Sequence, residues 1–135
     1  MSNNKVYGVF IMTHGRPDKQ FTYATLRRLN YTGPIKFVVD DEDPTVDKLK
    51  EKFGEDNVCV FNKDDIMKNY DSFYNQPYRK TVAYARMSLY KFAKELGWTH
   101  FIMMDDDYKS IIYKWNQPDE NGVSKSKGLT ARNLD

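Results

Sequence analysis

Three consecutive carboxylates, Asp105, Asp106 and Asp107, follow directly on an apolar run at residues 101–104. Side chains of a strand alternate between its two faces, so the pattern predicts Asp105 and Asp107 on one side and Asp106 on the other. Protein carboxylates typically hold Mg²⁺ one or two at a time, with water and substrate phosphates completing its shell. Acidic residues after a strand also form turns and helix N-caps. The triplet therefore indicates either a turn or a divalent-cation site for a reaction on a diphosphate compound, and we favour the cation site.

Two arginines lie on an apolar stripe of the helix predicted over residues 79–96. Arg86 falls between Val82 and Leu89 on this stripe, and Arg79 lies two turns earlier. A guanidinium on an apolar stripe must reach water or pair with an anion, because burial of an unpaired charge is strongly unfavourable. Arg86 is therefore predicted to contact either a phosphate group or an aspartate of the triplet. Arg79 is a second candidate near the helix N-terminus, which favours anions.

Polar residues also follow the first two predicted strands. In the loop at residues 13–17, Gly15 lets the backbone approach a ligand closely, and Arg16 can reach a phosphate. Such a loop is also common as a simple turn. Asp40 ends the second strand and is a candidate to accept hydrogen bonds from a nucleobase or a ribose. The acidic residues 41–43 that follow it are expected to form a solvated loop.

Signatures of other nucleotide and catalytic sites are absent from the sequence. It contains no Gly-x-Gly-x-x-Gly after the first strand and no Gly-x-x-x-x-Gly-Lys-Ser/Thr, so neither a dinucleotide fold nor a P-loop is indicated. It also contains no Gly-x-Ser-x-Gly nucleophile elbow. His14 and His100 are isolated and lack the spacing of a zinc site, so we predict that they are surface or core histidines.

The composition indicates a folded chain without a strong overall charge. Of the 135 residues, 40% are hydrophobic and 15% are aromatic, which argues against disorder although 30% are charged. The 21 basic and 19 acidic side chains leave a formal charge of +2. A nucleic acid or a membrane surface would therefore have to meet a local patch rather than a global field.

The sequence also bears on the compartment of the protein. The single Cys59 lies in an apolar run and is expected in the core, which fits a reducing environment. No apolar stretch approaches the roughly 18 residues of a membrane span. Residues 1–4 have no signal-peptide core. We therefore expect a cytoplasmic protein without membrane attachment.

Apolar runs and helical patterns alternate along most of the chain. Buried strands are predicted at residues 6–12, 35–39, 57–61 and 100–104. Helices or helical turns are predicted at residues 18–30, 46–53, 66–70 and 79–96. The alternation predicts an α/β fold with a Rossmann-like, mostly parallel sheet flanked by helices on both faces. Ligands of such sheets bind beyond the carboxyl ends of the strands, where the strand order reverses.

The pattern changes after the triplet. Residues 109–115 are predicted to form a strand that enters a C-terminal β-hairpin over residues 116–122. Residues 124–135 form a polar tail. The length falls in the range of a single domain, so we expect one domain over residues 1–135.

Taken together, the motifs resemble the nucleotide-sugar half of a GT-A glycosyltransferase over residues 5–113. The likeness rests on four segments: Thr13-x-x-Arg16-Pro17, Asp40-Asp41, Ala85-Arg86 and Met103-Met104-Asp105-Asp106-Asp107. The motifs are also similar to the phage-type, TET-associated glycosyltransferases, which add sugar to hydroxymethylated pyrimidines in DNA. The resemblance implies a metal-dependent transferase that moves a sugar from a nucleotide-diphosphate donor, such as UDP-glucose, to an acceptor hydroxyl.

The resemblance also implies roles for individual residues. The Asp-x-Asp element of the family binds Mn²⁺ or Mg²⁺, so Asp107 would be the main metal ligand and Asp105 would contact the metal or the ribose. Arg86 would lie near the diphosphate. The residues expected to bind the nucleotide sugar are Thr13, Arg16, Asp40, Arg79, Arg86, Asp105 and Asp106.

The chain departs from the GT-A pattern near its C-terminal end. Only 28 residues follow Asp107, whereas the family continues into a half that binds the acceptor and, in inverting members, supplies the catalytic base. We therefore expect a donor-binding domain whose acceptor half is short or missing, and we assign no catalytic base. One alternative is a truncated or non-catalytic nucleotide-sugar-binding module. Another is a nucleotidyltransferase, although that class commonly carries a Gly-rich basic loop after the first strand, and this loop has one Gly and one Arg.

Overall fold

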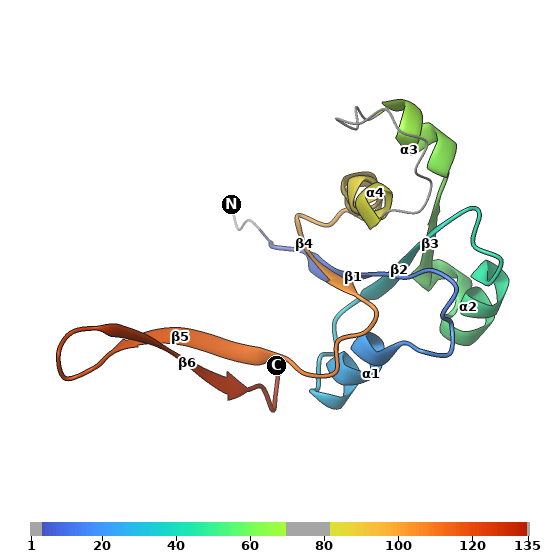
Figure 1. Ribbon diagram of the computed structural model, residues 1–135. Helices are drawn as coiled ribbons and strands as arrows, with labels where there is room; N and C mark the ends of the chain where they lie inside the picture. Colours follow the sequence, from blue (N-terminus) through green and yellow to red (C-terminus); the bar gives the residue numbers. More distant parts are fainter. Residues whose placement is uncertain (1–3, 70–81, 135) are drawn as a thin grey trace.

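A computed structural model gives the fold of residues 4–69 and 82–134. Figure 1 shows a twisted sheet flanked by helices and, projecting away from it, a long two-stranded ribbon. All neighbouring strands of the sheet are parallel, which confirms the predicted α/β class. The sheet has the strand order β3-β2-β1-β4 and consists of β1 (Tyr7–Met12), β2 (Ile35–Asp40), β3 (Val58–Phe61) and β4 (His100–Asp105).

Helices cover both faces of the sheet, as the alternating pattern predicts. α3 (Lys63–Asn69) and α4 (Val82–Leu96) pack on one face, and α1 (Phe21–Arg28) and α2 (Val46–Phe53) pack on the other. A single turn of 3₁₀ helix, η1 (Glu55–Asn57), precedes β3. β1 and β2 send successive buried side chains to the two cores in turn. Their sequences are continuous apolar runs for this reason, because a strand covered on both faces has no solvent side.

β4 is an edge strand and is more exposed than its sequence predicts. The apolar run predicts a strand buried on both faces, but Ile102 is 59% exposed and Met103 is 46% exposed. Phe101 and Met104 are only partly buried against the two cores. Among the described strands β4 pairs with β1 alone, so no described strand flanks its outer edge.

The start of β4 is fixed against β1 by close packing. Gly8 in β1 lies against the indole of Trp98, and a Cβ atom at Gly8 would come within 2.5 Å of that ring. The Val6 amide donates to Thr99 Oγ1 at 3.0 Å, and Thr99 Oγ1 in turn donates to the Val6 carbonyl at 3.0 Å. These contacts set the β1–β4 register, in which Met12 lies opposite Asp105.

α1 is shorter than its sequence pattern predicts. The helix was expected over residues 18–30, but it spans Phe21–Arg28. Asn30 ends it, because its φ of 67° lies in the left-handed region where a helix cannot continue. At the other end, the Lys19 amide donates to the Arg16 carbonyl, so the residues before Phe21 form a turn. For α4, the described part agrees with the predicted helix, and Gly97 follows its last residue with a φ of 71°.

The predicted C-terminal hairpin is present, with a second strand where only a polar tail was expected. β5 (Ile112–Pro118) and β6 (Ser124–Thr130) form an antiparallel ribbon in which every residue is exposed. Asp119 shapes the turn, because its Oδ1 accepts the amides of Asn121 and Val123 at 2.9 Å each. The polar composition of β6 hid it from the sequence pattern, since a strand that buries neither face has no apolar alternation.

Two expectations, one about the burial of Cys59 and one about membrane-spanning segments, can be compared with the structure. Cys59 is partly buried beside the α3–α4 core, and burial raises the pKa of its thiol to about 11. The thiol therefore stays protonated at neutral pH, in agreement with a packing role. Within residues 4–69 and 82–134, no helix has the length and apolar character needed to span a bilayer.

Candidate functional site

A pocket of about 540 Å³ lies beyond the carboxyl ends of the strands. The strand order reverses at this point, because β1 has β2 on one side and β4 on the other. Parallel α/β sheets bind ligands at such a reversal, and the volume is in the range of small-molecule sites. The pocket is lined by Met12, Thr13, His14, Arg16, Asp40, Phe61, Lys63, Val82, Ala85, Arg86, Asp105, Asp106 and Asp107.

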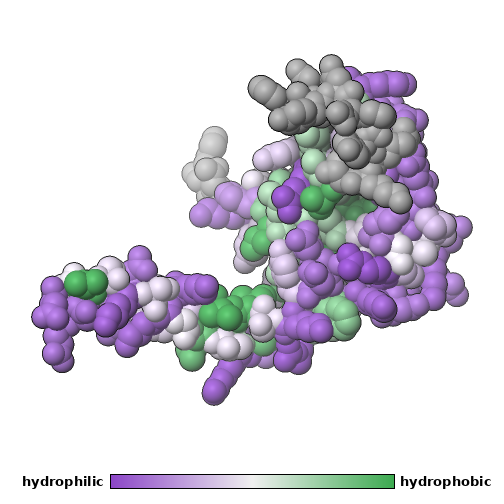
Figure 2. Space-filling view, viewed as in Figure 1, coloured by the Kyte–Doolittle hydropathy of each residue, from purple (hydrophilic) through white to green (hydrophobic). Residues whose placement is uncertain are grey.

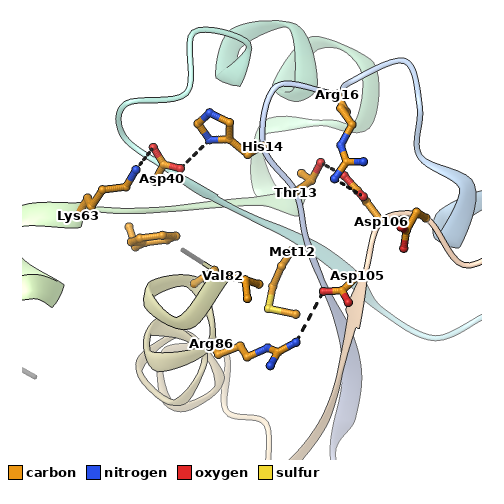
Figure 3. A pocket seen from close by; sticks show the side chains of 13 residues that line it. Met12, Thr13, His14, Arg16, Asp40, Lys63, Val82, Arg86, Asp105 and Asp106 are labelled. Atoms are coloured by element: carbon orange, nitrogen blue, oxygen red, sulfur yellow. Dashed lines mark hydrogen bonds and ion pairs between the residues drawn. The ribbon is translucent and has the colours of Figure 1, made fainter. Parts of the chain in front are cut away.

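Asp105 and Arg86 point toward each other in the pocket (Figure 3). Arg86 Nη2 lies 3.9 Å from Asp105 Oδ1, and the Tyr108 hydroxyl donates to Asp105 Oδ2 at 3.2 Å. Both members of the ion pair are about half exposed, so their mutual attraction is weak. The structure therefore confirms the contact of Arg86 with an aspartate of the triplet, and it leaves both side chains able to bind a ligand.

Asp107 lines the same pocket as Asp105, as expected, but it reaches the pocket through a turn and not through strand alternation. β4 ends at Asp105, and the next two residues form a turn, so the period-two rule stops before Asp107. Asp107 is exposed, whereas Asp106 is buried. The expected alternation over the triplet is therefore wrong, and all three carboxylates reach one pocket because the chain turns.

Asp106 is buried beneath the loop that follows β1, with 1% of its side chain exposed. Its Oδ1 lies 3.0 Å from Arg16 Nη2, and its Oδ2 accepts the Thr13 hydroxyl at 2.5 Å. Gln20 Nε2 donates to Thr13 Oγ1 at 2.9 Å and also to the Arg16 carbonyl. These bonds join the ends of β1 and β4 and fix the direction of the Arg16 guanidinium, which remains half exposed at the pocket.

A second charged cluster lies at the end of β2 (Figure 3). Asp40 Oδ2 is 2.8 Å from His14 Nδ1, and Asp40 Oδ1 is 3.3 Å from Lys63 Nζ. Lys63 also pairs with Glu42 at 3.3 Å, and only 6% of its side chain is exposed. A buried ammonium needs such carboxylate partners, because an unpaired charge in a core is strongly unfavourable. Asp40 is therefore held in one orientation at the pocket wall.

The acidic loop after β2 is less solvated than its sequence predicts. Asp43 is buried, and its carboxylate accepts the Gly15 amide at 2.8 Å and the Thr45 amide at 2.7 Å. Burial alone would raise the pKa of Asp43, but the hydrogen bonds from Thr45 and Gly15 hold the pKa of this carboxyl below its ordinary value. Gly15 has a φ of 67°, so a residue without a Cβ presents its amide to Asp43 without strain. Asp43 thus ties the loop after β1 to the loop after β2.

The structure gathers most of the predicted site residues into this pocket. Arg79 lies outside the described residues. The apolar stripe predicted for α4 is buried at Leu89, but Val82 is 45% exposed because it lines the pocket. The predicted residues that line the pocket are Thr13, Arg16, Asp40, Arg86, Asp105, Asp106 and Asp107.

Two ionisable lining residues, His14 and Lys63, were not predicted as part of the site. His14 is a surface residue, as expected, but it also contacts Asp40 at the pocket wall. Lys63 follows β3 at the same edge of the sheet. A signal existed for Lys63, because the carboxyl ends of parallel strands meet at one edge and the residues after β3 are polar. No sequence signal distinguishes a paired His14 from an isolated one.

The oxygen ligands in the pocket fit a hard divalent cation that a substrate helps to hold. Asp105 is half exposed and Asp107 is exposed, so both carboxylates are accessible. Among residues 4–69 and 82–134, no group of three or more carboxylate, imidazole or thiol side chains is arranged to hold a metal ion. At phosphate sites, Mg²⁺ or Mn²⁺ needs only one or two protein carboxylates, because phosphate oxygens and water complete the shell.

Fold and pocket together define a Rossmann-like α/β protein with a pocket lined by charged side chains at the strand-order reversal. The model of the TET-Associated Glycosyltransferase family matches residues 7–134, and the chain belongs to that family. The match includes all four strands of the sheet and the C-terminal ribbon. No curated protein and no solved structure matches the chain. This match confirms the resemblance to the TET-associated glycosyltransferases and places the chain in the class of glycosyltransferases.

Proposed function

We propose that this protein is a metal-dependent glycosyltransferase that uses a nucleotide-diphosphate sugar, with a UDP-sugar as the expected donor. The observation that carries the proposal is the pocket at the strand-order reversal, where accessible carboxylates and arginines meet. Asp105, Asp107 and Arg86 are the central residues. A diphosphate with a divalent cation needs this combination, because the cation requires oxygen ligands and the phosphates require positive charge.

The charge balance of the pocket supports a bound cation. Its lining includes four carboxylates and three cationic side chains, so its formal charge is negative when His14 is neutral. A diphosphate would be repelled by such a pocket. A divalent cation would reverse the sign of the local charge, and bound cations are often the largest local charges in a phosphate site.

Within the proposal, the arginines differ in how they are held. Arg86 has a weak ion pair with Asp105 and can move to a phosphate once Asp105 binds the metal. Arg16 is held by the buried Asp106, so it is oriented before any ligand binds. Asp106 and Thr13 bond to each other, so in this proposal they act as positioning residues for Arg16. Asp40 would accept hydrogen bonds from the nucleoside.

The chemistry requires stabilisation of the leaving group. The acceptor hydroxyl oxygen forms a bond to the anomeric carbon, the bond from that carbon to the diphosphate oxygen breaks, and the hydroxyl proton passes to water or to the released diphosphate. When bound, the cation would act as a Lewis acid that neutralises the developing charge of the diphosphate. Arg86 would donate hydrogen bonds to the same phosphate oxygens, where they strengthen as charge develops. The expected acceptor is a hydroxymethylated pyrimidine in DNA, as the resemblance to TET-associated enzymes implies.

Donor turnover tests the proposal. We expect UDP-glucose to be hydrolysed slowly, or its glucose transferred to hydroxymethylated DNA, in the presence of Mn²⁺. Asp107→Asn should lower the rate about 100-fold, which is typical for the loss of one charge-stabilising group. The melting temperature should not change, because Asp107 is exposed.

Asp56→Asn is the matched control. Asp56 is also an exposed aspartate, but it precedes β3 at the opposite, amino-terminal edge of the sheet. This variant should turn over the donor like the wild type. Donor binding without turnover would instead support the non-catalytic module. Release of pyrophosphate from a nucleoside triphosphate and a sugar phosphate would support the nucleotidyltransferase.

A further inference from the structure

The β5–β6 ribbon extends from the body of the protein and buries neither of its faces. Figure 1 shows it leaving the sheet beyond the end of β4, and Figure 2 shows it as a slender and mostly hydrophilic arm. Only residues 106–111 connect β4, which ends with Asp105 of the pocket, to the ribbon. An isolated two-stranded hairpin is at best marginally stable. A ribbon that contributes to no core is therefore expected to gain stability from a binding partner.

The ribbon register divides its side chains into two different faces. Residues directly opposite each other in an antiparallel pair share a face, and the faces alternate with period two. Tyr113 lies opposite Leu129, and Trp115 lies opposite Lys127. The aromatic-basic face therefore consists of Tyr113, Trp115, Gln117, Lys125, Lys127 and Leu129.

The aromatic-basic face has the charge that suits a polyanion. The two strands contain three lysines and no Asp or Glu, and two of these lysines, Lys125 and Lys127, are on this face. Lys125 Nζ lies 3.5 Å from Asp119 in the turn. None of the ion pairs found among the described residues includes Lys127. Lys127 thus carries a positive charge directly opposite Trp115, which is 46% exposed.

The spacing of the aromatic side chains indicates which form of polyanion fits. Tyr113 and Trp115 are two residues apart on one strand, which separates them by about 7 Å. Bases stacked in a duplex rise by about 3.4 Å per strand, so two neighbouring stacked bases do not match this distance. Bases of an unpaired strand can be drawn apart and stacked singly on aromatic rings while lysines contact the backbone.

We propose that the aromatic-basic face binds single-stranded nucleic acid, with bases stacked on Tyr113 and Trp115 and phosphates near Lys125 and Lys127. The identification of this strand as the carrier of the acceptor rests on the proposed function. The binding itself rests on the ribbon alone. A short connection from the ribbon to the aspartate pocket would then bring an unpaired base near the donor.

Fluorescence anisotropy with a labelled pyrimidine oligonucleotide of about 12 nucleotides, in the absence of any donor, tests the inference. Trp115→Ala should weaken binding about tenfold, and Trp115→Phe should restore most of the affinity, since a ring that stacks is retained. Lys127→Gln should reduce the salt dependence of binding by about one phosphate contact. Lys114→Gln is the matched control, because this substitution removes the same charge from the other face of the same ribbon.

Three results would overturn the inference. They are an unchanged affinity for Trp115→Ala, an equal loss for Lys114→Gln and Lys127→Gln, and a duplex that binds as tightly as the single strand. Its failure is distinguishable from failure of the proposed function. Strand binding without any donor binding would refute only the donor site, and donor turnover without strand binding would refute only the ribbon site.

Discussion

The aspartate pocket and the β5–β6 ribbon place charged side chains in opposite environments. In the pocket, Asp106 and Lys63 are almost fully buried, and each is held by partners from a different part of the chain. In the ribbon every residue of both strands is exposed, and Lys125 pairs only with the nearby turn residue Asp119 among the described ion pairs. In the two proposals, this difference separates a preorganised site for a small ligand from an adaptable surface for a flexible one. Preorganisation lowers the cost of binding, because fewer side chains lose freedom when the ligand arrives.

The largest expected contrast between the two regions is in their packing. Leu89 in α4 is 0% exposed beneath the pocket, whereas Leu129 in β6 is 59% exposed. Leu89→Ala should lower the free energy of unfolding by about 3 kcal/mol, since it removes buried methyl groups and leaves a cavity. Leu129→Ala should change it by less than about 0.5 kcal/mol. Urea denaturation of both variants measures the contrast, and similar values would show that the ribbon packs against another surface in solution.

A sharper comparison lies between two adjacent residues of the triplet. Asp106→Asn should destabilise the protein by about 2 kcal/mol, because it removes a charged partner of the half-exposed Arg16 and weakens the bond from Thr13. Asp105→Asn should leave the melting temperature nearly unchanged, since Asp105 is half exposed and weakly paired. It should instead weaken donor binding. Thermal denaturation and donor titration separate the two roles, and equal melting temperatures would contradict the positioning role of Asp106.

The smallest expected effect concerns acid stability. The pKa of Asp43 is lowered in the folded protein, so its carboxylate stabilises the fold above the ordinary pKa of 3.8, and this contribution is lost as the pH falls through the lower, folded pKa. Asp43→Asn should therefore cost about 1 to 2 kcal/mol at neutral pH and progressively less below pH 3.8. Denaturation measured across this pH range checks the trend.

Glu120 in the turn of the ribbon provides the control for this trend. Glu120→Gln removes an exposed carboxylate, so it should change the free energy of unfolding by less than about 0.5 kcal/mol at every pH. A cost for Asp43→Asn that does not depend on pH would show that its packing, and not its charge, stabilises the two loops.

The same contrast explains which parts of the fold the sequence predicted. The order of strands and helices followed from apolar runs separated by glycine and proline, because elements that are covered on both faces have strong patterns. The exposure of Ile102 and the existence of β6 were missed, because edge position and an unburied ribbon leave no pattern in the sequence.

Sequence reasoning agreed with the structure where a rule of the fold applied. Asp105 was expected at the carboxyl end of its strand, with Arg86 against the aspartate triplet or a phosphate, and the two side chains form an ion pair. The burial of Asp43 and the pairing of His14 with Asp40 depend on the exact approach of two loops from different strands. Local sequence carries little information about such contacts, because residues 26 or more positions apart form them.

Calorimetric titration of UDP-glucose, with and without Mn²⁺, tests most directly the claim that the pocket holds the donor through its diphosphate. We expect binding that requires Mn²⁺ and that weakens about 100-fold in Arg86→Gln. Lys91→Gln should bind like the wild type, since Lys91 is an exposed cation on the same helix outside the pocket lining. UDP-glucose binding that is equally strong without Mn²⁺, or equally weakened by both substitutions, would contradict the account.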